Sequence, residues 1–146
     1  MAQIPDPREG LVLNYSYLWL SEHRKGLEDG SKDRPCAVVL TVANDEGRQI
    51  VTVLPVTHSP PKHAEDAVEI PTATKRRLGL DDQRSWIVLT EANEFNWPGP
   101  DLRPIIRSGS KSFSHGFLPY ALYEKVRTGF IEATIKRRAA TVNRTE

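Results

Sequence analysis

Proline and glycine are spread so densely along this chain that they leave room for strands but little room for long helices. Eleven prolines and nine glycines divide the 146 residues into short segments. Proline breaks helices and central strands, and glycine favours turns, so both residues mark where regular elements stop. The apolar runs between these breaks mostly have the length of a strand. The sequence therefore predicts a mainly β fold in one domain, as expected for a chain of ~150 residues.

The clearest pair of predicted strands surrounds a turn signal. Pro35–Val42 and Gln49–Val56 are both apolar and strand-sized, and Asn44-Asp45-Glu46-Gly47 lies between them. Because glycine readily takes a positive φ, this stretch is typical of a tight turn, and the two runs are expected to form a hairpin. With the turn centred on 44–47, residues 34 and 57 would lie opposite each other at the open end.

Further elements follow from the same punctuation. Additional strands are predicted at Gly10–Leu20, Ala67–Ile70 and Ser85–Glu91, and a helical turn at Thr74–Gly79. A longer helix is expected to begin near Pro119, since proline is favoured at a first helical position. Five short strands followed by one longer helix favour a small, bent β-barrel with the helix over one open end. The helix would present one apolar stripe made of Leu122, Val126, Phe130 and Ala133.

The remaining segments are expected to lack regular structure. Residues 1–9 are predicted to form an extended N-terminal arm and residues 139–146 a flexible tail. Between them, we expect a charged loop at 21–34, irregular structure at 93–107 and a mobile Ser/Gly-rich segment at 108–116.

Charge is distributed unevenly, although the chain as a whole carries only +1. Residues 1–102 have a net charge of −5 and residues 103–146 a net charge of +6. The basic last third suits a polyanion or an acidic protein partner, and a solvated helix face is an equally good interpretation.

The cysteine content and the N-terminal residues limit where the protein is expected to work. Cys36 is the one cysteine, which excludes an internal disulfide and a cysteine-based zinc site. The first residues have neither the basic nor the apolar stretch of a secretory signal, and no apolar run approaches the ~20 residues of a membrane span. We therefore expect a cytoplasmic protein.

Arg34 and Thr57 are the candidate site residues that the predicted hairpin brings together. Arg34 precedes one strand and Thr57 ends the other. A guanidinium beside a hydroxyl suits phosphate binding and can stabilise the charge of a phosphoryl transition state. On spacing alone, a surface arginine at a strand end is the alternative.

Motifs for other chemistries are absent. The sequence has no phosphate-loop, serine-hydrolase or zinc-protease signature. His58 and His63 lie close in sequence, but Pro60-Pro61 between them favours a solvated loop over a metal site. We expect no metal and no cofactor.

An ordered set of motifs around Arg34 and Thr57 resembles the MazF/PemK family of type II toxin–antitoxin systems. The resemblance covers roughly residues 10–91 and 117–135, including the C-terminal helix. The matching segments are Gly10-Leu11-Val12, Lys32–Val39, Pro55–Ser59, Val68–Pro71, Leu78-Gly79-Leu80 and Trp86–Leu89.

This resemblance implies an SH3-like barrel, a homodimer and a sequence-selective endoribonuclease that cuts single-stranded RNA without a metal. In such enzymes the 2′-hydroxyl attacks the adjacent phosphate and leaves a cyclic phosphate. By position, Arg34 would stabilise the charge on phosphorus and donate a proton to the leaving group, and Thr57 would hold the scissile phosphate. A cognate antitoxin would block the RNA groove with an acidic, disordered segment.

Three further residues are candidates for acid–base chemistry. His23 lies in the predicted loop and His58 follows Thr57, and histidine exchanges protons near neutral pH. Glu91 ends the stretch Leu89-Thr90-Glu91, where one branch of the family has Arg-x-Asp, so the carboxylate is kept and the arginine is missing.

Candidate RNA-binding residues share a positive charge, a hydroxyl or an aromatic ring. These RNA-binding candidates are Arg24, Lys25, Lys32, Ser59, Trp97 and Arg103. Trp19 and Phe95 are additional candidates for stacking on RNA bases, and each aromatic residue could equally belong to the core.

Two alternatives remain open because the segment 92–116 is longer than the usual link in the family. The first is a non-catalytic SH3-like barrel that binds RNA or a protein partner. The second is a degenerate toxin that only binds an antitoxin-like partner.

Overall fold

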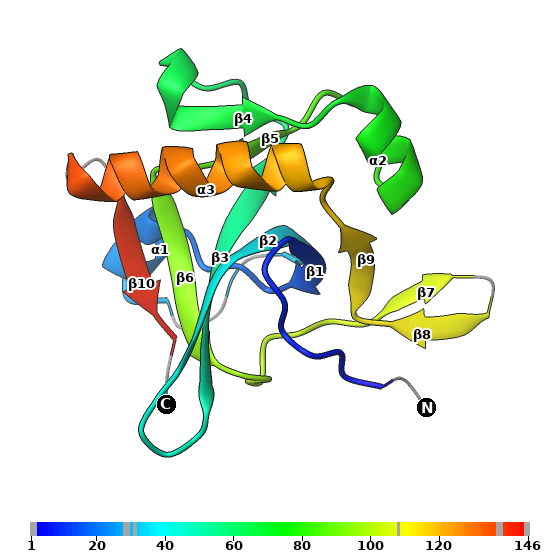
Figure 1. Cartoon of the computed structure of the whole chain (residues 1–146), viewed down its shortest axis with the longest axis vertical. Coiled ribbons are helices and arrows are strands. Elements are labelled where there is room, and N and C mark those ends of the chain that lie inside the picture. The colour runs from blue at the N-terminus through cyan, green and yellow to red at the C-terminus, as the bar shows by residue number, and fades with distance from the viewer. Residues whose placement is uncertain (1–2, 28–29, 31, 108, 137–138, 145–146) are drawn as a thin grey trace.

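The computed structural model describes residues 3–27, 30, 32–107, 109–136 and 139–144. Strands predominate in it (Figure 1). They are β1 (Leu11–Tyr15), β2 (Arg34–Ala43), β3 (Gln49–Thr57), β4 (Ala67–Glu69), β5 (Trp86–Val88), β6 (Glu91–Asn96), β7 (Ile105–Arg107), β8 (Ser110–Ser112), β9 (Ser114–Phe117) and β10 (Ala140–Asn143). The helical elements are α1 (Leu20–Arg24), the 3-10 turn η1 (Ala64–Asp66), α2 (Thr72–Leu78) and α3 (Tyr120–Ile135).

One twisted sheet organises the molecule. Its strands follow the order β10-β6-β3-β2-β1-β9, with β5 branching from β3 and carrying β4, while β7 and β8 form a separate hairpin. β10 pairs parallel with β6, whereas β2 pairs antiparallel with both β1 and β3. Figure 1 shows α3 running crosswise to β6 and β10, and α3 contacts β2 and β4.

The mainly β class and the C-terminal helix are confirmed, but hydrogen bonding does not close the sheet. Within the described part of the chain, the end strands β10 and β9 share no ladder. The predicted helical turn is the longer helix α2, and it ends as expected at Gly79, which has a φ of 70°.

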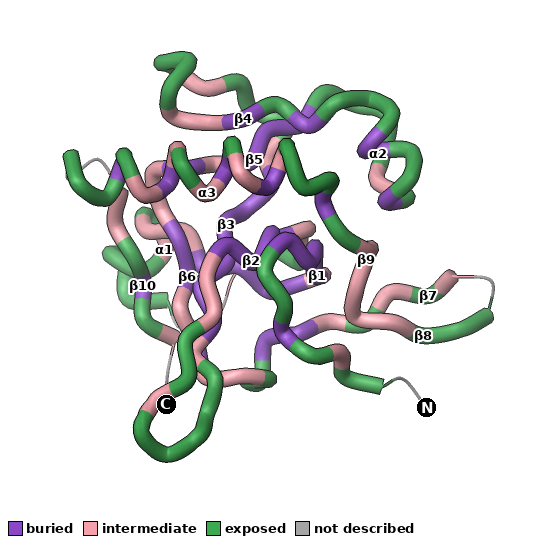
Figure 2. Tube along the Cα trace, in the orientation of Figure 1, coloured by how far each residue is buried: buried purple, intermediate pink, exposed green. Residues whose placement is uncertain are grey.

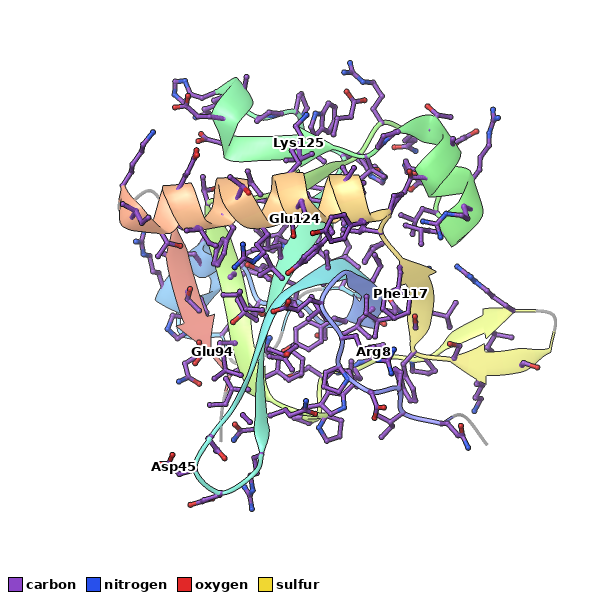
Figure 3. The ribbon with its side chains drawn as sticks, in the orientation of Figure 1. Arg8, Asp45, Glu94, Phe117, Glu124 and Lys125 are labelled. Atoms are coloured by element: carbon purple, nitrogen blue, oxygen red, sulfur yellow. The ribbon has the colours of Figure 1, made fainter. Side chains whose placement is uncertain are left out.

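The predicted β2–β3 hairpin is confirmed, with a one-residue displacement near its tip. Asp45 marks that tip in Figure 3. Ala43 lies opposite Gln49 there, one residue away from the predicted pairing. A bulge between Val38 and Leu40 absorbs the displacement, since a bulge places one extra residue on a single strand.

Beyond the bulge, the register matches the prediction. Cys36 lies opposite Pro55, as the sequence predicted. Two residues further on, Arg34 begins β2 and Thr57 ends β3 at the same end of the hairpin. The bulge therefore restores the juxtaposition on which the predicted site depends.

The central strands are buried on both faces, which explains their apolar sequences. Val39 and Leu54 belong to one hydrophobic cluster, to which α3 contributes Tyr123. Val38 and Val53 point to the opposite face and belong to the second cluster. Figure 2 shows this burial at the centre of the sheet.

The N-terminal elements differ from the prediction. The predicted strand Gly10–Leu20 is too long, because β1 stops at Tyr15 and α1 follows it. α1 occupies the start of the segment 21–34, which was predicted to be a loop; part of that segment lies outside the described residues. The Glu91 carboxylate accepts the Leu20 N–H at 2.9 Å and so fixes the start of α1.

The segments 93–107 and 108–116 were predicted to be irregular and mobile, but β6 to β9 occupy much of them. Residues 97–104, between β6 and β7, lack helix and strand as predicted. β6 lies between β3 and β10, and β9 extends the sheet beside β1. The sequence of β6 is rich in Glu and Asn, which have low strand propensity, so its neighbours in the sheet decide its conformation. Phe95 is 1% exposed there, and residue 108 lies outside the described residues.

The predicted C-terminal helix is confirmed. α3 begins directly after Pro119. Val126, Phe130 and Ala133 of the predicted stripe are buried, and Leu122 is half-buried against the same cluster.

The segment 139–146, predicted to be a flexible tail, contributes a strand. β10 pairs with β6 across Ala140–Asn143. The Arg144 side chain is only 5% exposed and lies 2.9 Å from the Asp101 carboxylate. Its guanidinium also donates to the Asn93 side-chain oxygen at 3.0 Å.

Candidate functional site

A cavity of about 610 Å³ opens at the end of the β2–β3 hairpin, where β2 begins and β3 ends. Trp19 lines one side, and residues around η1 and the end of β5 complete the wall. Its polar lining includes Lys32, Arg34, Thr57, His58, Lys62 and Asp66. The lining carries more positive than negative side chains, so the cavity favours an anionic ligand.

Arg34 is held in this cavity by two contacts. Its Nη1 donates to the Val56 carbonyl at 3.2 Å, and its guanidinium carbon lies 4.7 Å from the centroid of the Trp19 ring. The stacked ring restricts the guanidinium without using its N–H groups. Among the described residues, the Val56 bond is the one hydrogen bond that this guanidinium donates, and its buried Nε has no partner. Arg34 is thus oriented while most of its donors remain available to a ligand.

Thr57 occupies the facing strand end. It pairs with Trp86 of β5, and its hydroxyl oxygen accepts the Ser59 N–H at 3.2 Å. This local bond turns the chain out of β3 and brings His58 and Ser59 onto the cavity wall. Arg34 and Thr57 therefore line one cavity, as the predicted register required.

His58 is the third polar group at this end of the hairpin. Its Nε2 lies 2.7 Å from Asp81 Oδ2. The other carboxylate oxygen of Asp81 accepts a hydrogen bond from the Lys75 ammonium at 2.6 Å. The Lys75 bond, with the His58 bond acting in the same direction, holds the pKa of the Asp81 carboxyl below its usual range.

A second cavity of about 210 Å³ adjoins the first. It is bordered by Leu80 and Asp81, which follow α2. Lys32, Arg34 and His58 line both cavities. These three side chains therefore lie between two hollows, with the Trp19 ring in the larger one.

Glu91, a predicted acid–base candidate, is not among the residues lining either cavity. Its Oε1 accepts hydrogen bonds from the Tyr17 hydroxyl at 3.0 Å and from the Leu20 N–H. Burial raises the pKa of the Glu91 carboxyl, and the two hydrogen bonds offset part of that effect. Its contacts tie α1 to β6.

The other candidates divide between the cavity and more distant positions. Lys32 and Ser59 line the larger cavity, whereas His23, Arg24 and Lys25 lie exposed on and after α1, outside its lining.

The remaining aromatic and basic candidates lie near the sheet. Phe95 is buried, with its ring stacked 4.8 Å from that of Tyr15, so it is a core residue and the stacking role considered for it is wrong. Trp97 stacks on Phe95 at 6.0 Å. Arg103 donates to the Pro100 carbonyl at 2.8 Å.

Sequence reasoning missed several members of the site. Lys62 lines the cavity from the loop beyond Pro60-Pro61, which was interpreted only as a solvated loop. Asp81 follows the left-handed Gly79 that ends α2, and that helix stop was the only available signal for a turn there. Lys75 carried no signal, since a lysine in a short helix is ordinarily exposed.

No group of three or more His, Cys, Asp or Glu side chains in the described part of the chain is arranged to hold a metal ion. Among those residues, no helix has the length and apolar character needed to cross a bilayer.

Comparison with known proteins adds no relative. The sequence matches no model of a known protein family, and no curated protein matches it. The functional assignment therefore depends on the geometry and chemistry of the Arg34 cavity.

Proposed function

We propose that this protein is a toxin-type endoribonuclease of the MazF/PemK kind, which cleaves single-stranded RNA without a metal. The observation that carries the proposal is the placement of Arg34, Thr57 and His58 around one cationic cavity. A guanidinium with available donors, a hydroxyl and an imidazole together suit an RNA phosphate and the proton transfers around it.

The proposed reaction is an internal transesterification. The 2′-oxygen of the ribose forms a bond to the adjacent phosphorus, and the bond from phosphorus to the 5′-oxygen of the next nucleotide breaks. His58 accepts the 2′-hydroxyl proton and Arg34 or a water molecule donates one to the departing oxygen. The products are a 2′,3′-cyclic phosphate and a 5′-hydroxyl. Arg34 stabilises the charge that builds up on the phosphate oxygens, and Thr57 holds the phosphate.

The two adjoining cavities support a single-stranded substrate. The residues shared by both cavities include Lys32 and Arg34, which suit the phosphate backbone. The Trp19 ring is half-buried beside Arg34 and offers a surface for a base, because unpaired bases stack on aromatic side chains. In a duplex, the bases would be paired and unable to enter.

The proposal includes the partners that the family resemblance implies. An antitoxin with an acidic segment would occupy the cationic cavity and exclude RNA. The proposed assembly is a homodimer of SH3-like barrels. Exposed apolar side chains support a protein contact near β9 and α3: Phe117, labelled in Figure 3, is 44% exposed and Tyr120 is 77% exposed.

Purified protein incubated with mixed RNA in EDTA tests the proposal, with end-group analysis of the fragments. Fragments with cyclic phosphate ends support the nuclease. RNA binding without cleavage would instead favour the non-catalytic RNA-binding alternative, since the same cavity can bind a phosphate. Absence of both binding and cleavage would contradict the proposed RNA substrate.

A further inference from the structure

Behind His58, a buried lysine holds an aspartate in place. The Lys75 side chain is only 5% exposed. Its ammonium donates to Asp81 Oδ1 at 2.6 Å, to Ser85 Oγ at 2.7 Å and to the Gln83 carbonyl. An ammonium group has three N–H donors, so these three acceptors use all of them.

Asp81 connects this buried lysine to the cavity. Its Oδ1 also accepts the Gln83 N–H at 3.1 Å, and its Oδ2 faces His58 Nε2 at 2.7 Å. Two bonds to one oxygen fix the carboxylate plane, so the second oxygen is aimed at the imidazole. The Lys75 bond lowers the pKa of the Asp81 carboxyl, which keeps this partner ionised at neutral pH.

An ionised carboxylate at Nε2 determines which nitrogen of a neutral His58 carries the proton. The carboxylate can only accept, so Nε2 carries the hydrogen and donates it. Nδ1 is then left with its lone pair. Among the described residues, Nδ1 has no hydrogen-bond partner, and His58 borders both cavities.

We propose that Asp81 and Lys75 are positioning residues that hold His58 with Nδ1 ready to accept the proton of the RNA 2′-hydroxyl. This inference rests on the proposed ribonuclease function and extends it to residues outside the Arg34–Thr57 pair. When Nδ1 takes that proton, the ring becomes an imidazolium, and Asp81 stabilises its positive charge. The proton then leaves to water after the products depart, which restores the neutral ring.

A merely structural ion pair would have a different consequence. The side chains of His58 and Asp81 are 50% and 47% exposed, and exposed pairs contribute little to folding stability. Asp81→Asn also removes the charged partner of the buried Lys75 ammonium, so urea unfolding must verify that this variant folds before its spectra and rates are compared. The tautomer of His58 tests the hydrogen bond on which both interpretations depend, and RNA cleavage by Asp81→Asn separates them.

NMR spectra that correlate imidazole nitrogens with carbon-bound ring protons test the inference without any RNA. In the full-length protein, above the pH at which its histidines are protonated, the His58 ring should be the Nε2–H tautomer. Comparison with His58→Gln identifies its signals. In Asp81→Asn, the amide oxygen would turn to Lys75 and the amide N–H₂ to His58, so the ring should shift to the Nδ1–H tautomer. Asp82→Asn, with the same charge change at the exposed neighbour, should leave it unchanged.

Steady-state cleavage provides the second readout. Asp81→Asn should lower kcat by ~10²-fold or more with KM nearly unchanged, as expected when a proton acceptor is lost. Asp82→Asn should cleave like the wild type. Equal rates in both variants, or an Nδ1–H ring in the wild type, would overturn the inference. An Nε2–H ring that depends on Asp81 in a protein that cuts no RNA would support the positioning of His58 and refute the ribonuclease instead.

Discussion

His115 gives the structure a predictable dependence on pH. Its Nδ1 lies 2.8 Å from Arg107 Nη2, and the same Arg107 group also donates to the Leu78 carbonyl. Burial, followed by the neighbouring guanidinium, lowers the pKa of His115 to about 4. A protonated ring would place its Nδ1–H donor against the Arg107 donor, so folding favours the neutral ring.

The size of the effect follows from the two pKa values of His115. In the unfolded chain the ring has its ordinary pKa of ~6.5, so between about pH 6.5 and 4 the unfolded state binds a proton that the folded state does not. Stability is therefore fully present above that window and is lost as the pH falls through it. Between pH 7 and pH 5 the loss would reach about 2 kcal/mol, and partial solvent exposure reduces it to about 1–2 kcal/mol.

Urea unfolding of the wild type and His115→Asn between pH 5 and pH 7.5 measures this contribution. The asparagine oxygen can accept from Arg107 as Nδ1 does, but it does not titrate. The variant should lose about 1–2 kcal/mol less than the wild type on acidification. His63→Asn, at an exposed histidine, should follow the wild-type curve. Parallel curves for the wild type and His115→Asn would refute the reasoning.

Two other substitutions test local features. Glu91→Gln keeps an acceptor for Tyr17 and Leu20 and removes a buried charge, since burial raises the pKa of the Glu91 carboxyl. The free energy of unfolding at pH 7 should therefore match or exceed that of the wild type, and RNA cleavage should be unchanged. Loss of cleavage in a stable variant would assign Glu91 to the reaction. Gly79→Ala should lower the free energy of unfolding by about 1–2 kcal/mol, because the φ of Gly79 is 70° and an added Cβ would lie 2.6 Å from Arg107 Nη2. A variant as stable in urea as the wild type would contradict this.

The site hairpin was predictable because its signals are local. A turn sequence and two apolar runs specify a register, and that register brings Arg34 near Thr57. The bulge at Val38–Leu40 was not predictable, since it depends on how β2 bends through the sheet. The prediction was correct at the site because the bulge compensates for a displaced turn.

The strands of the segment 93–116 were missed because their stability comes from distant neighbours. The β6 sequence resembles a loop, but the strand is buried between β3 and β10. The same holds for β10, whose partner lies far away in sequence. Contacts such as Arg144 with Asp101 depend on this packing, and no local pattern marks them.

The network behind His58 was also out of reach of sequence reasoning. Lys75 is in α2, and Asp81 is in the loop that follows. Only the course of the chain after Gly79 turns Asp81 toward the end of β3. The cavity residues near Arg34 were therefore predictable, whereas the residues that orient His58 required the fold.

RNA cleavage by Arg34→Ala, compared with Arg48→Ala, tests the central claim most directly. Both variants remove one guanidinium from the same hairpin, but Arg48 is exposed beside the tip and Arg34 lines the cavity. With folding verified by urea unfolding, Arg34→Ala should lose at least ~10²–10³-fold in kcat, because a charge-stabilising donor is removed from the transition state. Arg48→Ala should cleave at the wild-type rate. A folded Arg34→Ala protein that cleaves RNA as fast as Arg48→Ala would contradict the account.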